Sequence, residues 1–154
     1  MTYEETLHYL YTSIPVFQHS GASAYKPGLG TSIALDDYLG NPHKAYKTIH
    51  VAGTNGKGSV SHLLAAILRQ SGFKVGLYTS PHLVDFRERI RVNGKKISQD
   101  YVVDFVERHR SFFEPLHPSF FELTSSMAFE YFRDQQVDYA VIEVGLGGRL
   151  DSTN

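Results

Sequence analysis

The sequence predicts an α/β protein in which a mostly parallel β-sheet is flanked by helices, and three observations support this. A short strand, a glycine-rich loop and an apolar helical pattern follow one another over residues 47–72. Two further apolar stretches, 74–79 and 137–144, indicate strands that alternate with helical patterns. In the second stretch, Ala140 to Ile142 form a continuous apolar run, which suits a strand covered on both faces.

The amino-terminal part is predicted to be helical. Thr2 is followed three residues later by Glu5, a capping-box pattern that opens a helix to about residue 13. Residues 19–31 combine glycine, serine and proline and predict a loop. A short helix is expected over residues 32–39, ended by the glycine and proline that follow it.

After the second strand, the sequence predicts a hairpin and two long helices. Asn93-Gly94 is the favoured type I′ turn, and it lies inside a β-hairpin over residues 90–97. Ser98 is the expected N-cap of the next helix. Ser119 and Glu122 form a second capping box, which opens a helix that ends near residue 136.

Length and composition exclude several classes of protein. A chain of 154 residues with 42% hydrophobic and 20% charged residues suits a single soluble globular domain. A net charge of −1 gives no field for nucleic acid or anionic membranes, and the lack of cysteine excludes disulfides, thiolate zinc sites and cysteine nucleophiles. With no signal peptide and no long apolar stretch, we expect a cytoplasmic protein. Because the sequence stops directly after a glycine-rich loop, we also expect a fragment of a longer protein.

The loop between the first strand and its helix, predicted over residues 53–59, is the strongest candidate for a ligand site. Its small residues allow backbone N–H groups to converge on a phosphate at the positive end of the helix. Lys57 can reach distal phosphates, and Ser59 can offer its hydroxyl to phosphate or Mg²⁺. The loop departs from G-x-x-x-x-G-K-[ST], so a glycine-rich turn without a ligand is the alternative. The predicted phosphate-binding residues, which become ATP-binding residues under the resemblance given below, are Gly53, Thr54, Asn55, Gly56, Lys57, Gly58 and Ser59.

A carboxylate and a serine near other strand ends are candidates for a metal site. Glu143 ends an apolar strand, where a charge without a partner is costly. It is either a Mg²⁺ ligand, direct or through water, or half of a buried ion pair, and the phosphate loop favours the metal. Ser80 is a second candidate ligand, or else a turn or N-cap serine before Pro81. One site can collect Gly53, Ser80 and Glu143, since ligands bind beyond the carboxyl ends of parallel strands.

Other polar and aromatic residues give weaker signals. Arg87, Arg89 and Arg91 could contact phosphate, but an exposed arginine run is usually a solvated face. His50 and His82 are more often structural than catalytic in such positions. The aromatic pairs at 112–113 and 120–121 are most simply core, although residues 120–126 could line a pocket for a flat heterocycle.

Several motifs together resemble one enzyme family, the bifunctional dihydrofolate synthase/folylpolyglutamate synthases, which are relatives of the Mur ligases. The resemblance covers nearly the whole chain, and the shortened Lys57-Gly58-Ser59 form of the phosphate loop is typical of this family. The motifs occur in the family's order: Gly-Thr-Asn-Gly-Lys-Gly-Ser (53–59), Tyr-Thr-Ser-Pro-His-Leu (78–83), Phe-Arg-Glu-Arg-Ile (86–90), Phe-Phe-Glu-Leu-Thr-Ser (120–125) and Val-Ile-Glu-Val-Gly-Leu-Gly-Gly-Arg-Leu-Asp-Ser-Thr-Asn (141–154).

The resemblance implies a part of a Mur-ligase-like ATPase domain and a ligase that uses ATP and Mg²⁺. Such an enzyme joins L-glutamate to dihydropteroate or to the glutamate tail of a folate through an acyl phosphate, and the full-length enzyme is expected to be a monomer. Phosphoryl transfer needs positioning and charge neutralisation more than covalent side-chain chemistry. Residues 1–154 then correspond to the amino-terminal portion of the ATP-binding domain.

The roles of the family's residues carry over only to those positions of this sequence that match the family's motifs. Lys57 and Glu143 are the expected catalytic residues, and Ser59, Ser80 and Glu143 the expected metal ligands. Asp151 and Asn154 fall in the matching terminal motif, with no specific role assigned. The residues that match the family's pterin pocket are Thr79, Ser80, Pro81, His82, Leu83, Phe121 and Glu122.

Two further points follow from the resemblance. In the family, later segments supply a histidine metal ligand, a modified lysine and a carboxyl-terminal domain, so we expect these 154 residues alone to have little or no ligase activity. The alternatives are a Mur-type peptidoglycan ligase, a non-catalytic nucleotide-binding module and, third, a P-loop kinase or GTPase. The 79–82 and 121–122 motifs favour folate over a UDP-muramoyl substrate.

Overall fold

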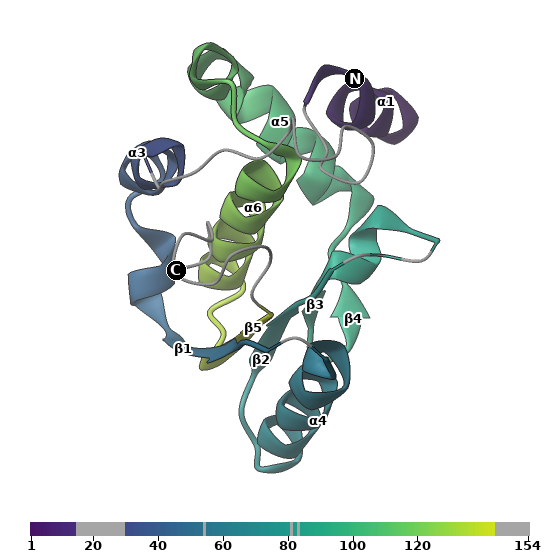
Figure 1. Cartoon of the computed structure of the whole chain (residues 1–154), viewed down its shortest axis with the longest axis vertical. Coiled ribbons are helices and arrows are strands. Elements are labelled where there is room, and N and C mark those ends of the chain that lie inside the picture. The colour runs from purple at the N-terminus through teal and green to yellow at the C-terminus, as the bar shows by residue number, and fades with distance from the viewer. Residues whose placement is uncertain (15–29, 54, 81, 83, 144–154) are drawn as a thin grey trace.

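The computed structural model describes residues 1–14, 30–53, 55–80, 82 and 84–143. In this part of the chain, one β-sheet carries helices on both faces (Figure 1). The α-helices are α1 (Tyr3–Ser13), α3 (Gly30–Tyr38), α4 (Lys57–Gln70), α5 (Gln99–Phe113) and α6 (Phe120–Asp134). Short 3₁₀ segments are η2 (Pro42–Ala45), η3 (Phe86–Arg89) and η4 (Glu114–Leu116).

The sheet is mixed and mostly parallel, as the sequence predicts. Its strand order is β1-β5-β2-β3-β4, in which β1, β5 and β2 are parallel and β3 and β4 are antiparallel additions. Asn93 and Gly94 have positive φ angles of 50° and 80°, the requirement of the predicted type I′ turn. The strand bounds are β1 (Lys47–Val51), β2 (Val75–Tyr78), β3 (Ile90–Val92), β4 (Lys95–Lys96) and β5 (Tyr139–Glu143).

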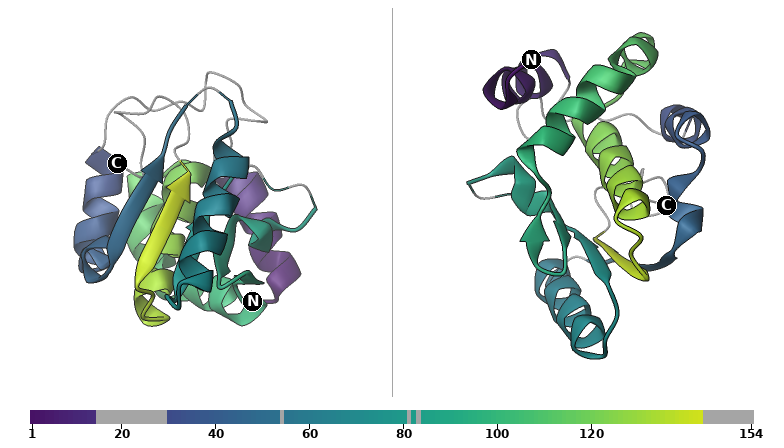
Figure 2. Two further views of the ribbon diagram at one scale, coloured as in Figure 1. Left: turned by 90° about the horizontal axis from the view of Figure 1, so that it is seen from below. Right: turned by 180° about the vertical axis from the view of Figure 1, so that it is seen from behind.

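Helices cover the two faces of the sheet unequally. Of the described helices, α4 alone lies on one face of the sheet, and α6 with the other helices lies on the opposite face (Figures 1 and 2). In β5, Val141 faces the small apolar cluster under α4, whereas Ala140 and Ile142 belong to the large core under α6. The prediction of a strand buried on both faces is therefore confirmed.

The predicted helix starts are confirmed by their caps. Thr2 and Glu5 form a complete capping box on α1, Ser119 and Glu122 form one on α6, and Ser98 accepts a hydrogen bond from the amide of Tyr101 at the start of α5. The short helix begins at Gly30, two residues earlier than predicted. Most of the predicted 19–31 loop and the last residue of the predicted 137–144 strand lie outside the described residues.

α4 leaves a row of apolar side chains exposed. The sequence places Leu63, Leu64, Ile67 and Leu68 at one helical spacing, but only Leu64 and Leu68 pack against the sheet. Leu63 is 61% and Ile67 53% exposed, because the apolar stripe is wider than the strip of helix that contacts the sheet.

Over the described residues, none of the helices combines the length and the apolar character needed to cross a bilayer.

A buried charge cluster joins α5 to α6, and the sequence analysis did not predict it. Glu130 is 3% exposed, and its carboxylate lies 3.0 Å from Nε2 of His109 and 3.1 Å from Nη1 of Arg108. Nδ1 of His109 lies 3.2 Å from the hydroxyl of Tyr38 on α3. Burial alone would raise the pKa of Glu130, but the hydrogen bonds and charges of His109 and Arg108 outweigh it and lower that pKa.

Glu130 is therefore expected to stabilise the fold except in acid. A carboxyl whose pKa is lower in the folded than in the unfolded chain contributes stability above its ordinary value of 4.5, and loses it as the pH falls through the folded value. We expect Glu130→Gln to lower the free energy of unfolding by about 2 kcal/mol at neutral pH, with the difference shrinking as the pH falls through the lowered folded pKa. Urea denaturation at a series of pH values from neutral into acid measures this. Asp104→Asn, which removes an exposed partner of Arg108, is the control and should cost less than about 0.5 kcal/mol.

Candidate active site

Three parallel strands end together at one edge of the sheet. β5 lies between β1 and β2, and the register pairs Val51 with Glu143 on one side and Tyr78 with Ile142 on the other. The segments that follow Val51 and Tyr78 therefore flank Glu143. Since the glycine loop follows β1 and Ser80 follows β2, the topology brings both segments to the same carboxylate.

The glycine loop leads directly into the amino terminus of α4. Gly56 is the N-cap with a left-handed φ of 73°, and Gly53 has a φ of 148°, so both positions favour glycine. Lys57 is the first residue of α4, which corrects the prediction that residues 53–59 all lie in the turn. Gly56 reverses the backbone early enough for Lys57, Gly58 and Ser59 to form the first helical turn.

This helix start is suited to an anion. α4 is 14 residues long, and the N–H groups of its first turn, which have no acceptor in a preceding helical turn, give it a partial positive charge. Gly53, Asn55, Gly56 and Ser59 are exposed, so a ligand can reach them. Thr54, another predicted ATP-binding residue, lies outside the described residues.

Glu143 lies against this helix start. It is only 5% exposed, and a Cβ built on Gly58 would lie 3.7 Å from its Oε2. Burial raises the pKa of Glu143, while a hydrogen bond from the backbone amide of Ser80 and the charges of Lys57 and Arg89 oppose the rise incompletely. The structure thus brings predicted residues from three separate segments around one carboxylate.

The donors present fit Mg²⁺ bound together with a nucleotide. Ser59, Ser80 and Glu143 offer two hydroxyl groups and one carboxylate, all hard oxygen donors. Among the described residues, no group of three or more His, Asp or Glu side chains could hold a metal by itself. Mg²⁺ commonly takes one or two carboxylates and completes its ligands with phosphate and water. This arrangement suits such a shared site better than a cage of protein ligands.

Two described residues of the predicted substrate segment after β2, Thr79 and His82, are held by Arg89 and Tyr11. The amide of Thr79 donates to the carbonyl oxygen of Arg89 at 3.0 Å. His82 accepts a 2.7 Å hydrogen bond at Nδ1 from Nε of Arg89, and its Nε2 lies 2.8 Å from the hydroxyl of Tyr11. Pro81 and Leu83 lie outside the described residues.

The start of α6 lies beside the end of β2. The ring of Phe121 is 5.7 Å from that of Tyr78, whose hydroxyl is 3.0 Å from the hydroxyl of Thr124. Glu122 is 6% exposed and uses Oε1 to accept a 2.8 Å hydrogen bond from the amide of Ser119. The structure therefore places Phe121 near the predicted site and gives Glu122 a role in capping α6.

Arg89 is buried, which differs from the prediction made from the sequence. The expectation of an exposed, solvated arginine run is wrong here, because Arg89 is 4% exposed and its guanidinium carbon lies 5.0 Å from the ring centroid of Phe120. The buried residues Phe86 and Ile90 bracket it. The residues between them, Arg87-Glu88-Arg89, give no local signal of which arginine faces inward.

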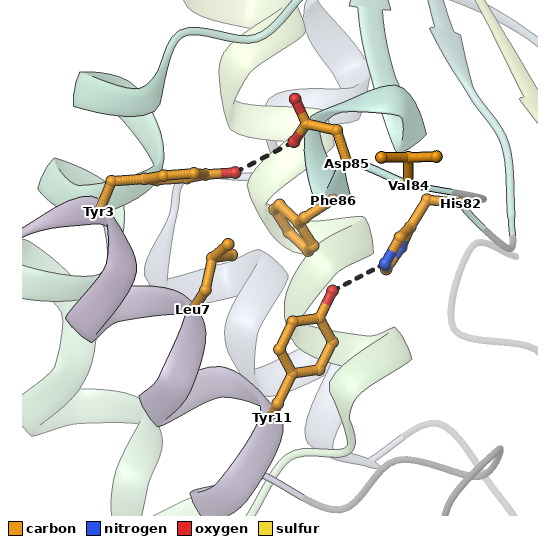
Figure 3. Close-up of a pocket in the computed structure, with 7 residues that line it drawn as sticks. All are labelled: Tyr3, Leu7, Tyr11, His82, Val84, Asp85 and Phe86. Carbon is orange, nitrogen blue, oxygen red and sulfur yellow. Dashed lines mark hydrogen bonds between the residues drawn. The ribbon is translucent and has the colours of Figure 1, made fainter.

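A pocket opens between α1 and the segment that contains His82, as Figure 3 shows. Its volume is about 580 Å³. Two hydrogen bonds cross it, from Tyr3 to Asp85 at 3.2 Å and between Tyr11 and His82. Of the predicted site residues that the structure describes, only His82 is among those that line this pocket: Tyr3, Leu7, Tyr11, His82, Val84, Asp85 and Phe86.

Comparison with known proteins gives one consistent group of relatives. The chain is 43% identical over 136 residues to a dihydrofolate synthase/folylpolyglutamate synthase of Bacillus subtilis, covering 84% of this chain and 32% of that protein. A crystal structure of folylpolyglutamate synthase from Thermotoga maritima superposes with a TM-score of 0.87 at 48% identity, covering 98% of this chain and 35% of that one.

A further solved structure is a folylpolyglutamate synthase complex with AMPPCP and folate. It superposes with a TM-score of 0.85 at 38% identity and covers 100% of this chain and 38% of that one. The chain spans about a third of the length of these three relatives. No protein-family model matches the chain.

Proposed function

Because the chain belongs to the folylpolyglutamate and dihydrofolate synthase family, we propose that it is part of a ligase that uses ATP and Mg²⁺. Residues 1–154 would be the amino-terminal portion of its ATP-binding domain. The proposed substrates are L-glutamate and either dihydropteroate or a folate with a glutamate tail. Relatives solved with AMPPCP, an analogue of ATP, and with folate support this choice over a UDP-muramoyl substrate.

In the proposed reaction, the carboxylate of the pteroate or folate attacks the γ-phosphorus of ATP. The bond between the β–γ bridging oxygen and that phosphorus breaks, which gives ADP and an acyl phosphate. The amine of L-glutamate then attacks the acyl carbon, the amide bond forms and inorganic phosphate leaves. Both steps bring anions together, so the site must supply positive charge and fixed orientation.

Different residues of this chain would bind the phosphates, neutralise their charge and hold the metal ion. Backbone N–H groups at the start of α4 would bind the phosphates, and Lys57 would neutralise charge on the distal ones. Ser59, Ser80 and Glu143 would hold Mg²⁺, which, when bound, neutralises charge on the phosphates. Because Glu143 is only 5% exposed, its charge acts in a medium that screens poorly.

One observation carries this proposal above the others. The buried carboxylate of Glu143 lies between the helix start at Gly58 and the amide of Ser80, at the edge where three parallel strands end. The amide of Ser80 and the charges of Lys57 and Arg89 offset the cost of burying this carboxylate only in part. A metal ion beside a triphosphate accounts for it.

Calorimetric titration of the chain with ATP and Mg²⁺ tests the proposal. We expect weak binding that depends on Mg²⁺ and falls by about tenfold or more in Lys57→Ala, since a charged hydrogen bond to phosphate is worth about 2 kcal/mol. Lys95→Ala, on the exposed hairpin strand β4, is the matched control and should bind as the wild type does. Equal binding by Lys57→Ala, or none by the wild type, would contradict the proposed site.

A further inference from the structure

The imidazole of His82 is held from two sides. Its Nδ1 lies 2.7 Å from Nε of Arg89, and its Nε2 lies 2.8 Å from the hydroxyl of Tyr11, the second contact being visible in Figure 3. The Nε–H of an arginine can only donate, so Nδ1 must be unprotonated and accept. The neutral ring then carries its proton on Nε2 and donates to Tyr11. Both ring nitrogens are therefore engaged by side chains of the protein.

Arg89 and Tyr11 also meet at a second ring. The guanidinium of Arg89 lies over Phe120 at 5.0 Å, and the ring of Tyr11 stacks on Phe120 at 5.4 Å with an interplanar angle of 19°. Tyr11, His82, Arg89 and Phe120 thus form a closed circuit of contacts. This circuit ties α1, the segment after β2, η3 and the first residue of α6 to one another.

The circuit adjoins both the proposed metal ligands and the proposed substrate-binding residues. Phe120 directly precedes Phe121, and the backbone of Arg89 holds the amide of Thr79. Ser80, between Thr79 and the His82 region, donates its amide to Glu143. The buried Arg89 therefore contacts both the segment that leads to Ser80, a proposed metal ligand, and the start of α6, where the proposed substrate residue Phe121 lies.

We propose that Arg89 is a positioning residue of the ligase reaction: it holds His82 and Phe120 together, so that the segment after β2 and the start of α6 meet the flat aromatic part of the substrate in one arrangement. This inference rests on the proposed function. Lysine cannot replace it, because the guanidinium donates to Nδ1 while its flat face lies over Phe120. An ammonium group has no such face.

The first test is the tautomer of His82, read from long-range ¹H–¹⁵N spectra of the imidazole at pH 8, with His82→Gln identifying the signal. We expect only Nε2–H in the wild type, and a mixture of tautomers in Arg89→Lys and Arg89→Gln. Arg91→Gln is the matched control, because Arg91 donates to the carbonyl of Glu88 at 3.3 Å. It should leave the tautomer unchanged. A wild-type His82 protonated on Nδ1 would overturn the proposal.

The second test separates positioning from general damage. Arg89→Lys should weaken binding of dihydropteroate, measured by fluorescence, by about tenfold while changing the affinity for MgATP by less than about twofold. Arg91→Gln should change neither affinity. Arg89→Lys that binds both ligands as the wild type does, or that loses both equally, would contradict the role of Arg89.

Two further outcomes distinguish this inference from the function on which it rests. A wild-type chain with the expected tautomer but no affinity for dihydropteroate would contradict the proposed substrate, while supporting the link between Arg89 and His82. Normal binding with the opposite tautomer would contradict the link alone. If both Arg89 variants fail to fold, Tyr11→Phe serves instead, because it keeps the stacking on Phe120. It should retain the Nε2–H tautomer, which Arg89 imposes, and loss of that tautomer would count against the inference.

Discussion

Glu143→Gln is expected to abolish most of the Mg²⁺-dependent nucleotide affinity while leaving the fold as stable as before, or more stable by about 1 kcal/mol. Burial raises the pKa of Glu143, which means that the ionised form is disfavoured in the folded chain. A carboxyl shifted in this direction costs stability in full above its folded pKa, and the cost fades as the pH falls from that raised value to the ordinary value of 4.5. Glutamine keeps the size and an acceptor for the amide of Ser80 but removes the charge.

Glu130→Gln is the matched control, since Glu130 is 3% and Glu143 5% exposed. The two carboxylates are equally buried but differ in partners, because Glu130 has His109 and Arg108 within 3.1 Å. We expect opposite outcomes: Glu130→Gln lowers stability and leaves MgATP affinity unchanged, whereas Glu143→Gln lowers that affinity about tenfold or more. Urea denaturation and calorimetry on the same samples measure both. Loss of stability in Glu143→Gln with intact MgATP binding would show that Glu143 is a structural ion-pair residue.

Gly76→Ala is expected to destabilise the fold more than any other single methyl added to the described glycines outside loops. Gly76 lies in β2 and faces α6, and a Cβ there would come within 2.6 to 2.9 Å of three ring atoms of Phe132. Phe132 is fully buried and packs against Tyr46, so its ring has little room to move. Overpacking of this kind costs about 1–3 kcal/mol. The free energy of unfolding from urea titration measures it.

Two further variants show whether the clash with Phe132 is the cause. Gly30→Ala adds a methyl with nothing within 4 Å in the first turn of α3, and it should be neutral or stabilising by about 0.5 kcal/mol. Phe132→Leu should relieve the contact, so the double variant should lose less stability than the sum of the two single variants. Strict additivity of Gly76→Ala and Phe132→Leu would rule out the ring of Phe132 as the source of the cost.

Local patterns predicted the elements well because each depends on a few neighbouring residues. Two capping boxes, Thr2 with Glu5 and Ser119 with Glu122, predicted the starts of two helices. The pair Asn93-Gly94 predicted a turn that needs two positive φ angles. Errors occurred at boundaries. The start of α4 at Lys57 was placed too late, because the apolar spacing begins only after the residues that form its first turn.

Side chains whose role depends on distant partners could not be predicted in this way. Arg89 looked like one of three solvated arginines, yet it is buried between His82 and Phe120. Glu130 gave no signal at all, since its partners His109 and Arg108 lie on another helix. Leu63 matched the apolar pattern of α4 but faces outward, because spacing cannot say how wide a strip of the helix the sheet will cover.

The sequence by itself determined the class of fold and the residues that could form a phosphate and metal site, because glycine, lysine, serine and glutamate at these positions limit the local backbone and chemistry. The tertiary structure decided which of them meet. Strand order places β5 between β1 and β2, and this puts Glu143 between Gly58 and Ser80. It also decided which charges are buried, since burial depends on contacts between segments far apart in the chain, which no local pattern encodes.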